Sequence, residues 1–148
     1  MVSRISGQQT AAAATVALSP IRVLLVEEDT NDLRLFASSL ERYGYEVRPC
    51  ARYSDGVRCL ERESFDFILV SQGGPEFEGR SVLERARELD RRTPILVVTR
   101  CPGMKCYLEA MELGALDYVE KPYSPSQFAR LVETYLRPDP GSGPRAAN

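Results

Sequence analysis

Short apolar runs alternate with longer helical repeats along the middle of the chain. The runs begin near residues 21, 45, 65, 94 and 117 and are rich in aliphatic and β-branched residues, as in buried parallel strands. A helical pattern follows each run. We expect its apolar positions to form the core: Leu33, Phe36, Ala37, Leu40, Val57, Leu60, Val82, Leu83, Ala86, Leu89, Met104, Tyr107, Leu108, Met111, Phe128, Leu131, Val132 and Tyr135.

The expected helix ends carry capping signals. Ser124 to Gln127 reads Ser-Pro-Ser-Gln, with an N-cap serine, proline at the first helical position and glutamine at the third. Gly44 and Gly114 stand where the first and fourth helices should end. Five consecutive strand–helix units predict an α/β fold, a five-stranded parallel sheet with right-handed crossovers and helices on both faces.

Length and composition favour a single folded domain. The chain has 148 residues, 43% hydrophobic and 27% charged, and we expect a domain over 20–137 between disordered tails at 1–19 and 138–148. A net charge of −2 gives no basic footprint, which argues against nucleic acid as a direct ligand. No apolar run approaches the ~18 residues of a membrane span, so we expect a cytoplasmic protein. The alternative for the alanine-rich stretch 11–18 is a signal peptide.

The four cysteines lack a paired C-x-x-C, and the chain has no histidine, which argues against a zinc site. We expect free thiols, with Cys50 and Cys59 packed as small apolar groups. Cys101, beside Arg100 near an expected helix N-terminus, is the alternative case of a redox-sensitive thiol.

Polar residues stand where the apolar runs stop: Glu27 and Glu28, Ser71, Thr99, and Lys121. Ligands bind beyond the carboxyl ends of parallel strands, so these residues should converge on one site. The loop 27–32 carries four carboxylates and no glycine, which excludes a dinucleotide fingerprint and a P-loop. Such a loop repels the phosphate of FMN and attracts a divalent cation.

At these positions the chain resembles the receiver domain of bacterial two-component response regulators, a flavodoxin-like (βα)5 fold. The resemblance covers about residues 20–137. It rests on Val-Glu-Glu-Asp at 26–29, Phe-Asp at 65–66, Pro-Glu-Phe-Glu-Gly at 75–79, Thr-Pro-Ile at 93–95 with Thr99, and Gly-Ala-Leu-Asp-Tyr-Val-Glu-Lys-Pro-Tyr at 114–123.

The resemblance implies a metal site, which one residue of this chain alters. In the family, two acids after strand one and the carbonyl two residues past the phosphoacceptor aspartate help to hold Mg²⁺; here these are Glu27, Glu28 and the Gly73 backbone. The aspartate itself corresponds to Ser71, which cannot form an acyl phosphate. A unit-charge pair at ~4 Å contributes about 4 kcal/mol at an effective dielectric near 20, so we expect weak Mg²⁺ binding or none.

The resemblance also assigns the phosphoryl contacts. A Thr or Ser ending strand four and a Lys before Pro correspond to Thr99 and Lys121, and an aromatic that reorients on occupation of the site corresponds to Tyr118. Lys121, without the usual aspartate, should pair with Glu27 or Glu28. We hypothesise that the Arg100 guanidinium reaches that acidic pair and fills the site; the alternative is a solvated loop arginine.

These observations predict a stand-alone, atypical receiver in a two-component or phosphorelay pathway, which acts by protein contact without aspartate phosphorylation and is not an enzyme. Only 11 residues follow Arg137. The expected partner is a histidine kinase or a downstream effector, bound at the fourth helix, fifth strand and fifth helix. The alternatives are phosphorylation of Ser71 by a Ser/Thr kinase and a small-ligand site.

Overall fold

The computed structural model describes residues 19–90, 92–122 and 124–136. The predicted tails, apart from residue 19, and the alanine-rich stretch lie outside these residues. The described part forms five parallel strands in the order β2-β1-β3-β4-β5. Their bounds are β1 Arg22–Val26, β2 Glu46–Cys50, β3 Phe67–Ser71, β4 Ile95–Thr99 and β5 Asp117–Glu120.

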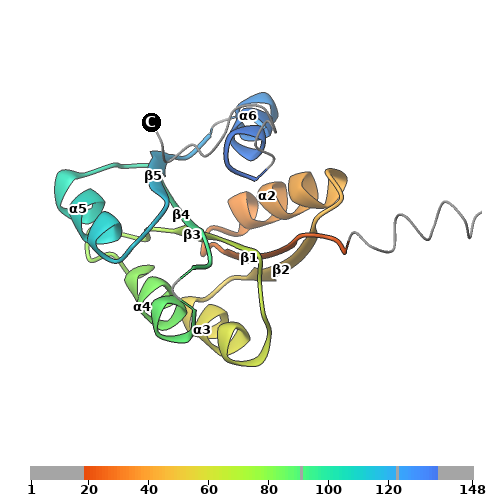
Figure 1. The fold of residues 1–148 in the computed structure, drawn as a ribbon. Coiled ribbons are helices and arrows are strands. Elements are labelled where there is room, and N and C mark those ends of the chain that lie inside the picture. The colour runs from red at the N-terminus through yellow and green to blue at the C-terminus, as the bar shows by residue number, and fades with distance from the viewer. Residues whose placement is uncertain (1–18, 91, 123, 137–148) are drawn as a thin grey trace, which may run out of the picture.

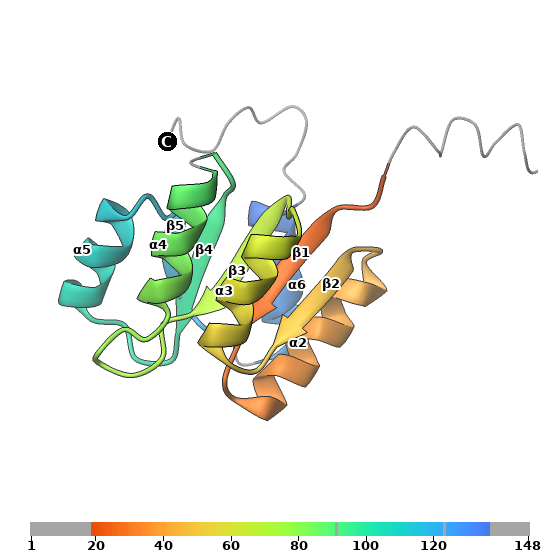
Figure 2. The ribbon, with the colours of Figure 1, turned by 90° about the horizontal axis from the view of Figure 1, so that it is seen from below.

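Helices cover both faces of the sheet, as the alternating pattern predicts (Figure 1). Two helices lie on one face, α2 (Thr30–Arg42) and α6 (Pro125–Tyr135). Three lie on the other, α3 (Tyr53–Arg62), α4 (Arg80–Leu89) and α5 (Met104–Glu112) (Figure 2). The expected α/β architecture is confirmed.

Alternate residues of each strand contribute side chains to two separate hydrophobic cores, one on each face of the sheet. On the α2 and α6 face, Phe36 stacks on Phe128 with ring centroids 4.8 Å apart and packs against strand residues such as Val23 and Leu25. On the opposite face, Leu24 and Val26 pack with α3, α4 and α5. Strands β1, β3 and β4 are inside the sheet, which explains their nearly continuous apolar sequences.

The predicted caps are confirmed where they fall on described residues. The Ser124 hydroxyl accepts the Gln127 N–H at 3.2 Å, and Pro125 opens α6. Gly44 and Gly114 follow α2 and α5 with φ of 92° and 87°, a backbone conformation that favours glycine.

The prediction of a buried apolar face on α5 is wrong for its largest side chains. Met104 is 70% exposed and Leu108 is 52% exposed, and Tyr107 is also exposed. The buried positions of this helix are Cys106 and Ala110. Small residues face the sheet here, so the same helical period places the large apolar side chains in solvent. Leu89 at the end of α4 is likewise 47% exposed.

Candidate functional site

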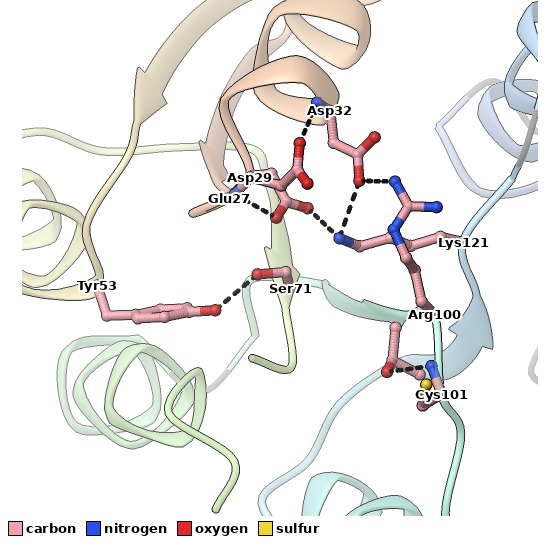
Figure 3. Close-up of polar contacts among 9 residues, drawn as sticks. Glu27, Asp29, Asp32, Tyr53, Ser71, Arg100, Cys101 and Lys121 are labelled. Atoms are coloured by element: carbon pink, nitrogen blue, oxygen red, sulfur yellow. Dashed lines mark hydrogen bonds and ion pairs between the residues drawn. The ribbon is translucent and has the colours of Figure 1, made fainter. Parts of the chain in front are cut away.

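The carboxyl edge of the sheet brings the predicted polar residues together, as Figure 3 shows for most of them. Ser71 and Thr99 are the last residues of β3 and β4, and Lys121 directly follows β5. Glu27, after β1, is 1% exposed, and the other three are also buried. Glu28 is the exception, because its side chain is exposed.

An ion-pair network fills the acidic side of the site. The Lys121 ammonium lies 2.8 Å from Glu27 Oε1 and 3.1 Å from Asp32 Oδ2. Arg100 reaches the same Asp32 oxygen at 2.5 Å. The expectation that Lys121 pairs with Glu27 or Glu28 is confirmed for Glu27, with Asp32 as a second partner.

The hypothesis that Arg100 reaches Glu27 and Glu28 is wrong in its partner, because the guanidinium binds Asp32. The helix start explains the difference. The Asp29 side chain accepts the Asp32 N–H at 2.9 Å as the N-cap of α2, which places Asp32 in the first turn, facing the site. Asp32 therefore receives both cations, as Figure 3 shows.

Burial controls the protonation of the central acid. Desolvation raises the pKa of the Glu27 carboxyl above its usual value, and the Lys121 ammonium and the Asp29 N–H partly reverse that shift. The negative charge of Glu27 thus depends on Lys121. Lys121 is already paired with two buried carboxylates, one of which it shares with Arg100.

Ser71 is covered from the other side of the site. Its hydroxyl lies 2.7 Å from the Tyr53 hydroxyl, and Ser71 is 2% exposed. Tyr53 is the first residue of α3, and burial raises the pKa of its phenol well above the usual value. The Ser71–Tyr53 pair is therefore a neutral hydrogen bond, located where the family resemblance places a carboxylate.

A second hydrogen-bonded chain joins strand β5 to the β3–α4 and β4–α5 loops beside the site. The Tyr118 hydroxyl donates to Gln72 Oε1 at 2.5 Å and accepts the Gly103 N–H at 3.1 Å. Gln72 also donates to the Gly74 carbonyl at 3.0 Å. Tyr118 is 9% exposed, so this ring is held inward. The Thr99 hydroxyl accepts the Cys101 N–H at 3.1 Å, which fixes the start of the β4–α5 loop.

Comparison with known proteins assigns this architecture. A family model described as the response regulator receiver domain matches residues 23–133. The chain belongs to the response regulator receiver family. The receiver is 30% identical over 114 residues to the transcriptional regulatory protein ZraR of Salmonella typhimurium, a match covering 77% of this chain and 25% of that protein.

Two further relatives support the same assignment. The alkaline phosphatase synthesis transcriptional regulatory protein PhoP of Bacillus subtilis is 29% identical over 116 residues, covering 78% of this chain and 48% of that protein. A CheY-like receiver domain structure from Methanospirillum hungatei has a TM-score of 0.72 and 29% identity, covering 80% of this chain and 95% of that one. The chain thus spans between a quarter and about half of the two transcriptional regulators.

The receiver's donor set fits Mg²⁺ poorly. Glu27 is buried in an ion pair with Lys121, Glu28 is exposed, and Ser71 supplies a hydroxyl bound to Tyr53. Among the described residues, no group of three or more acids or cysteines lies close enough together to hold a metal ion. The Gly73 backbone, the third predicted ligand, turns with φ of 88° at the edge of the site.

A cavity of about 580 Å³ opens beside these residues, between the β3–α4 loop and the β4–α5 loop. Its lining includes the charged residues Glu27, Arg100 and Lys121 and the less polar residues Met104 and Cys106. Its size is in the range of pockets for small molecules. In the described part of the receiver, no helix is long and apolar enough to cross a membrane.

Sequence reasoning missed three residues of the site: Asp32, Tyr53 and Gln72. Each had a positional signal. Asp32 falls three residues after the N-cap of α2, Tyr53 opens the helix after β2, and Gln72 directly follows Ser71. Their roles depend on side-chain contacts across the sheet edge, which no local pattern specifies.

Proposed function

We propose that this receiver works in two-component signalling through protein contact, without phosphorylation of an aspartate. The observation that carries the proposal is the occupation of Lys121 by Glu27 and Asp32, at 2.8 and 3.1 Å. A phosphoryl group would have to displace these buried carboxylates, and Ser71 offers no carboxylate to carry it. Breaking buried ion pairs is expensive, which favours the arrangement in which Lys121 stays paired. We call this paired arrangement the closed site; the cavity lies beside it.

The contact surface is the one that the family resemblance nominates, α5, β5 and α6. Its apolar part comprises four exposed side chains, which we call the α5 patch: Met104, Tyr107, Leu108 and Leu116. The Tyr107 ring packs edge-on against Tyr118, with centroids 5.8 Å apart. Tyr118 is hydrogen-bonded to Gln72 and Gly103 beside the closed site. The α5 patch therefore contacts the site through the Tyr118 ring. We propose that an apolar face of a kinase or effector protein binds the α5 patch.

Amide NMR titration with Mg²⁺ and then beryllofluoride tests the proposal. The native receiver should give no shifts at Thr99, Tyr118 and Lys121. Ser71→Asp restores an acid at the end of β3 and is the positive control; its amides should respond. A response of the native chain at those three residues would overturn the proposal.

A second variant tests the contact itself. Met104→Ser with Leu108→Ser removes apolar area from exposed positions and should leave the unfolding midpoint unchanged. Binding to the partner histidine kinase or effector should then fall at least tenfold, as expected for loss of a buried apolar anchor. Full binding by this double variant would exclude the α5 patch.

The cavity supports a second candidate function, the binding of a small ligand. Its volume of about 580 Å³ and its mixed charged and apolar lining suit an organic molecule with an anionic group. A fragment screen by amide NMR should then shift Gly103 and Cys106 together. Phosphorylation of Ser71 by a Ser/Thr kinase has less support, because its hydroxyl is buried and bonded to Tyr53.

A further inference from the structure

Two thiols meet on the face of the sheet that α3 covers. The sulfur atoms of Cys50 and Cys59 lie 3.6 Å apart, and both cysteines are free. Cys50 is the last residue of β2 and is 6% exposed, whereas Cys59 lies in α3 and is partly exposed. A disulfide needs a sulfur separation of ~2.0 Å, so closing the remaining gap takes a small side-chain adjustment.

We propose that Cys50 and Cys59 form an oxidant-sensitive dithiol site, which a hydroperoxide converts into an intramolecular disulfide. The proposal is independent of the proposed function. It goes beyond the sequence expectation of free, packed thiols at Cys50 and Cys59, which the structure confirms, and it concerns a different thiol from Cys101. Cys101 is exposed, and no sulfur contact joins it to another described cysteine.

The exposures of the two cysteines fix the order of the chemistry. The partly exposed Cys59 thiolate attacks an oxygen of hydrogen peroxide and the O–O bond breaks, which gives a sulfenic acid and a hydroxide. The hydroxide takes up the proton that the Cys59 thiol released and leaves as water. The Cys50 sulfur then attacks the Cys59 sulfur. The S–S bond forms, the S–O bond breaks, and the departing hydroxide takes the Cys50 proton as water. Overall the two thiols give two electrons to the peroxide, and two waters are released.

Burial also makes Cys50 the poorer first nucleophile. It is the largest cause that raises the pKa of the Cys50 thiol to about 12, and the neighbouring Cys59 adds to that shift. The geometry gives the same order, because Cys59 is the cysteine that is partly exposed.

The disulfide would act on the functional site through short connections. The Cys50 carbonyl accepts the Glu27 N–H at 3.0 Å, and Tyr53, between the two cysteines in sequence, bonds Ser71. The side-chain adjustment at Cys59 changes the packing of α3 against the end of β2. Oxidation should therefore change the environments of Tyr53 and Ser71.

The test is hydrogen peroxide treatment of the full chain in its native form and as the Cys101→Ser, Cys106→Ser double variant. Both should lose two hydrogen atoms by intact mass and yield a Cys50–Cys59 cross-linked peptide under non-reducing digestion. A dithiol reductant should restore the starting mass. Cys59→Ser should abolish the cross-link completely.

Amide NMR gives the structural readout. Oxidation should shift Tyr53 and Ser71 and leave Val132, on the opposite face in α6, unchanged. The proposal is overturned if peroxide oxidises Cys59 to the sulfinic acid without a cross-link, or links separate chains. Peptide mapping of the native chain gives the same answer should the double variant fail to fold.

Discussion

Replacing Lys121 with methionine should destabilise the receiver by about 3–5 kcal/mol at neutral pH, because it leaves a buried carboxylate without its counterion. Charges 2.8 Å apart, as in the Glu27–Lys121 pair, attract each other by about 6 kcal/mol at an effective dielectric near 20. Both side chains are at most 8% exposed, so solvent screens the pair little. Asp32 keeps its contact with Arg100 in the variant.

The loss of stability caused by Lys121→Met should depend on pH in a defined direction. Burial raises the pKa of Glu27 in the folded state, so the stability linked to its protonation is present at low pH and lost as pH rises through that pKa. Without Lys121 the pKa of Glu27 rises further. More of the stability that depends on Glu27 protonation is then lost near neutral pH. The difference between variant and native receiver should therefore shrink on acidification from about pH 8 to about pH 5.

Urea unfolding followed by circular dichroism measures both effects, with a double-mutant cycle through Glu27→Gln. The double variant should recover most of the loss, because its buried amide carries no charge. Arg85→Met is the matched control: Arg85 pairs with Glu61 and Glu88 at the surface and should contribute less than about 1 kcal/mol. A deficit that is independent of pH and not relieved by Glu27→Gln would refute the reasoning.

Four further substitutions, one of them a control, test contacts around the site by urea unfolding. Tyr118→Phe should cost about 1–3 kcal/mol, because it leaves the buried Gln72 Oε1 without its donor and the Gly103 N–H without its acceptor; an unchanged midpoint would exclude those bonds. Gly79→Ala should cost more than about 3 kcal/mol, because a Cβ there would lie 2.2 Å from the Ser71 carbonyl oxygen. Gly103→Ala, with nothing within 4 Å, is its control and should stay within about 0.5 kcal/mol. Tyr53→Phe should cost about 1 kcal/mol and broaden or shift the Ser71 amide; an unperturbed Ser71 amide would argue against the hydroxyl pair.

The fold was predictable because its signals are local. Strand length, helical period and caps such as Ser124 depend on neighbouring residues, and the predicted strand starts fall within two residues of the observed ones. The convergence of Glu27, Ser71, Thr99 and Lys121 followed from the geometry of parallel sheets. These predictions needed no knowledge of side-chain contacts.

The wrong predictions arise where one sequence pattern is compatible with two arrangements in the structure. On α5 the period places Met104 and Leu108 on one face and Cys106 and Ala110 on another. Either face could meet the sheet, and volume decides, because the small residues allow the helix to approach. The partner of Arg100 was ambiguous for a similar reason, since four carboxylates lie within one loop and its following turn.

The closed site also limits how the receiver could switch. A ligand changes a two-state equilibrium only through its different affinities for the two states, and moving a population from 1:99 to 99:1 takes about 5.5 kcal/mol. The ion pairs of Lys121 and the two hydrogen bonds of Tyr118 all favour one arrangement. Ser71 offers no acyl phosphate to oppose them. We therefore infer that binding at the α5 patch or in the cavity, rather than phosphoryl transfer, would have to supply the free energy for a conformational change.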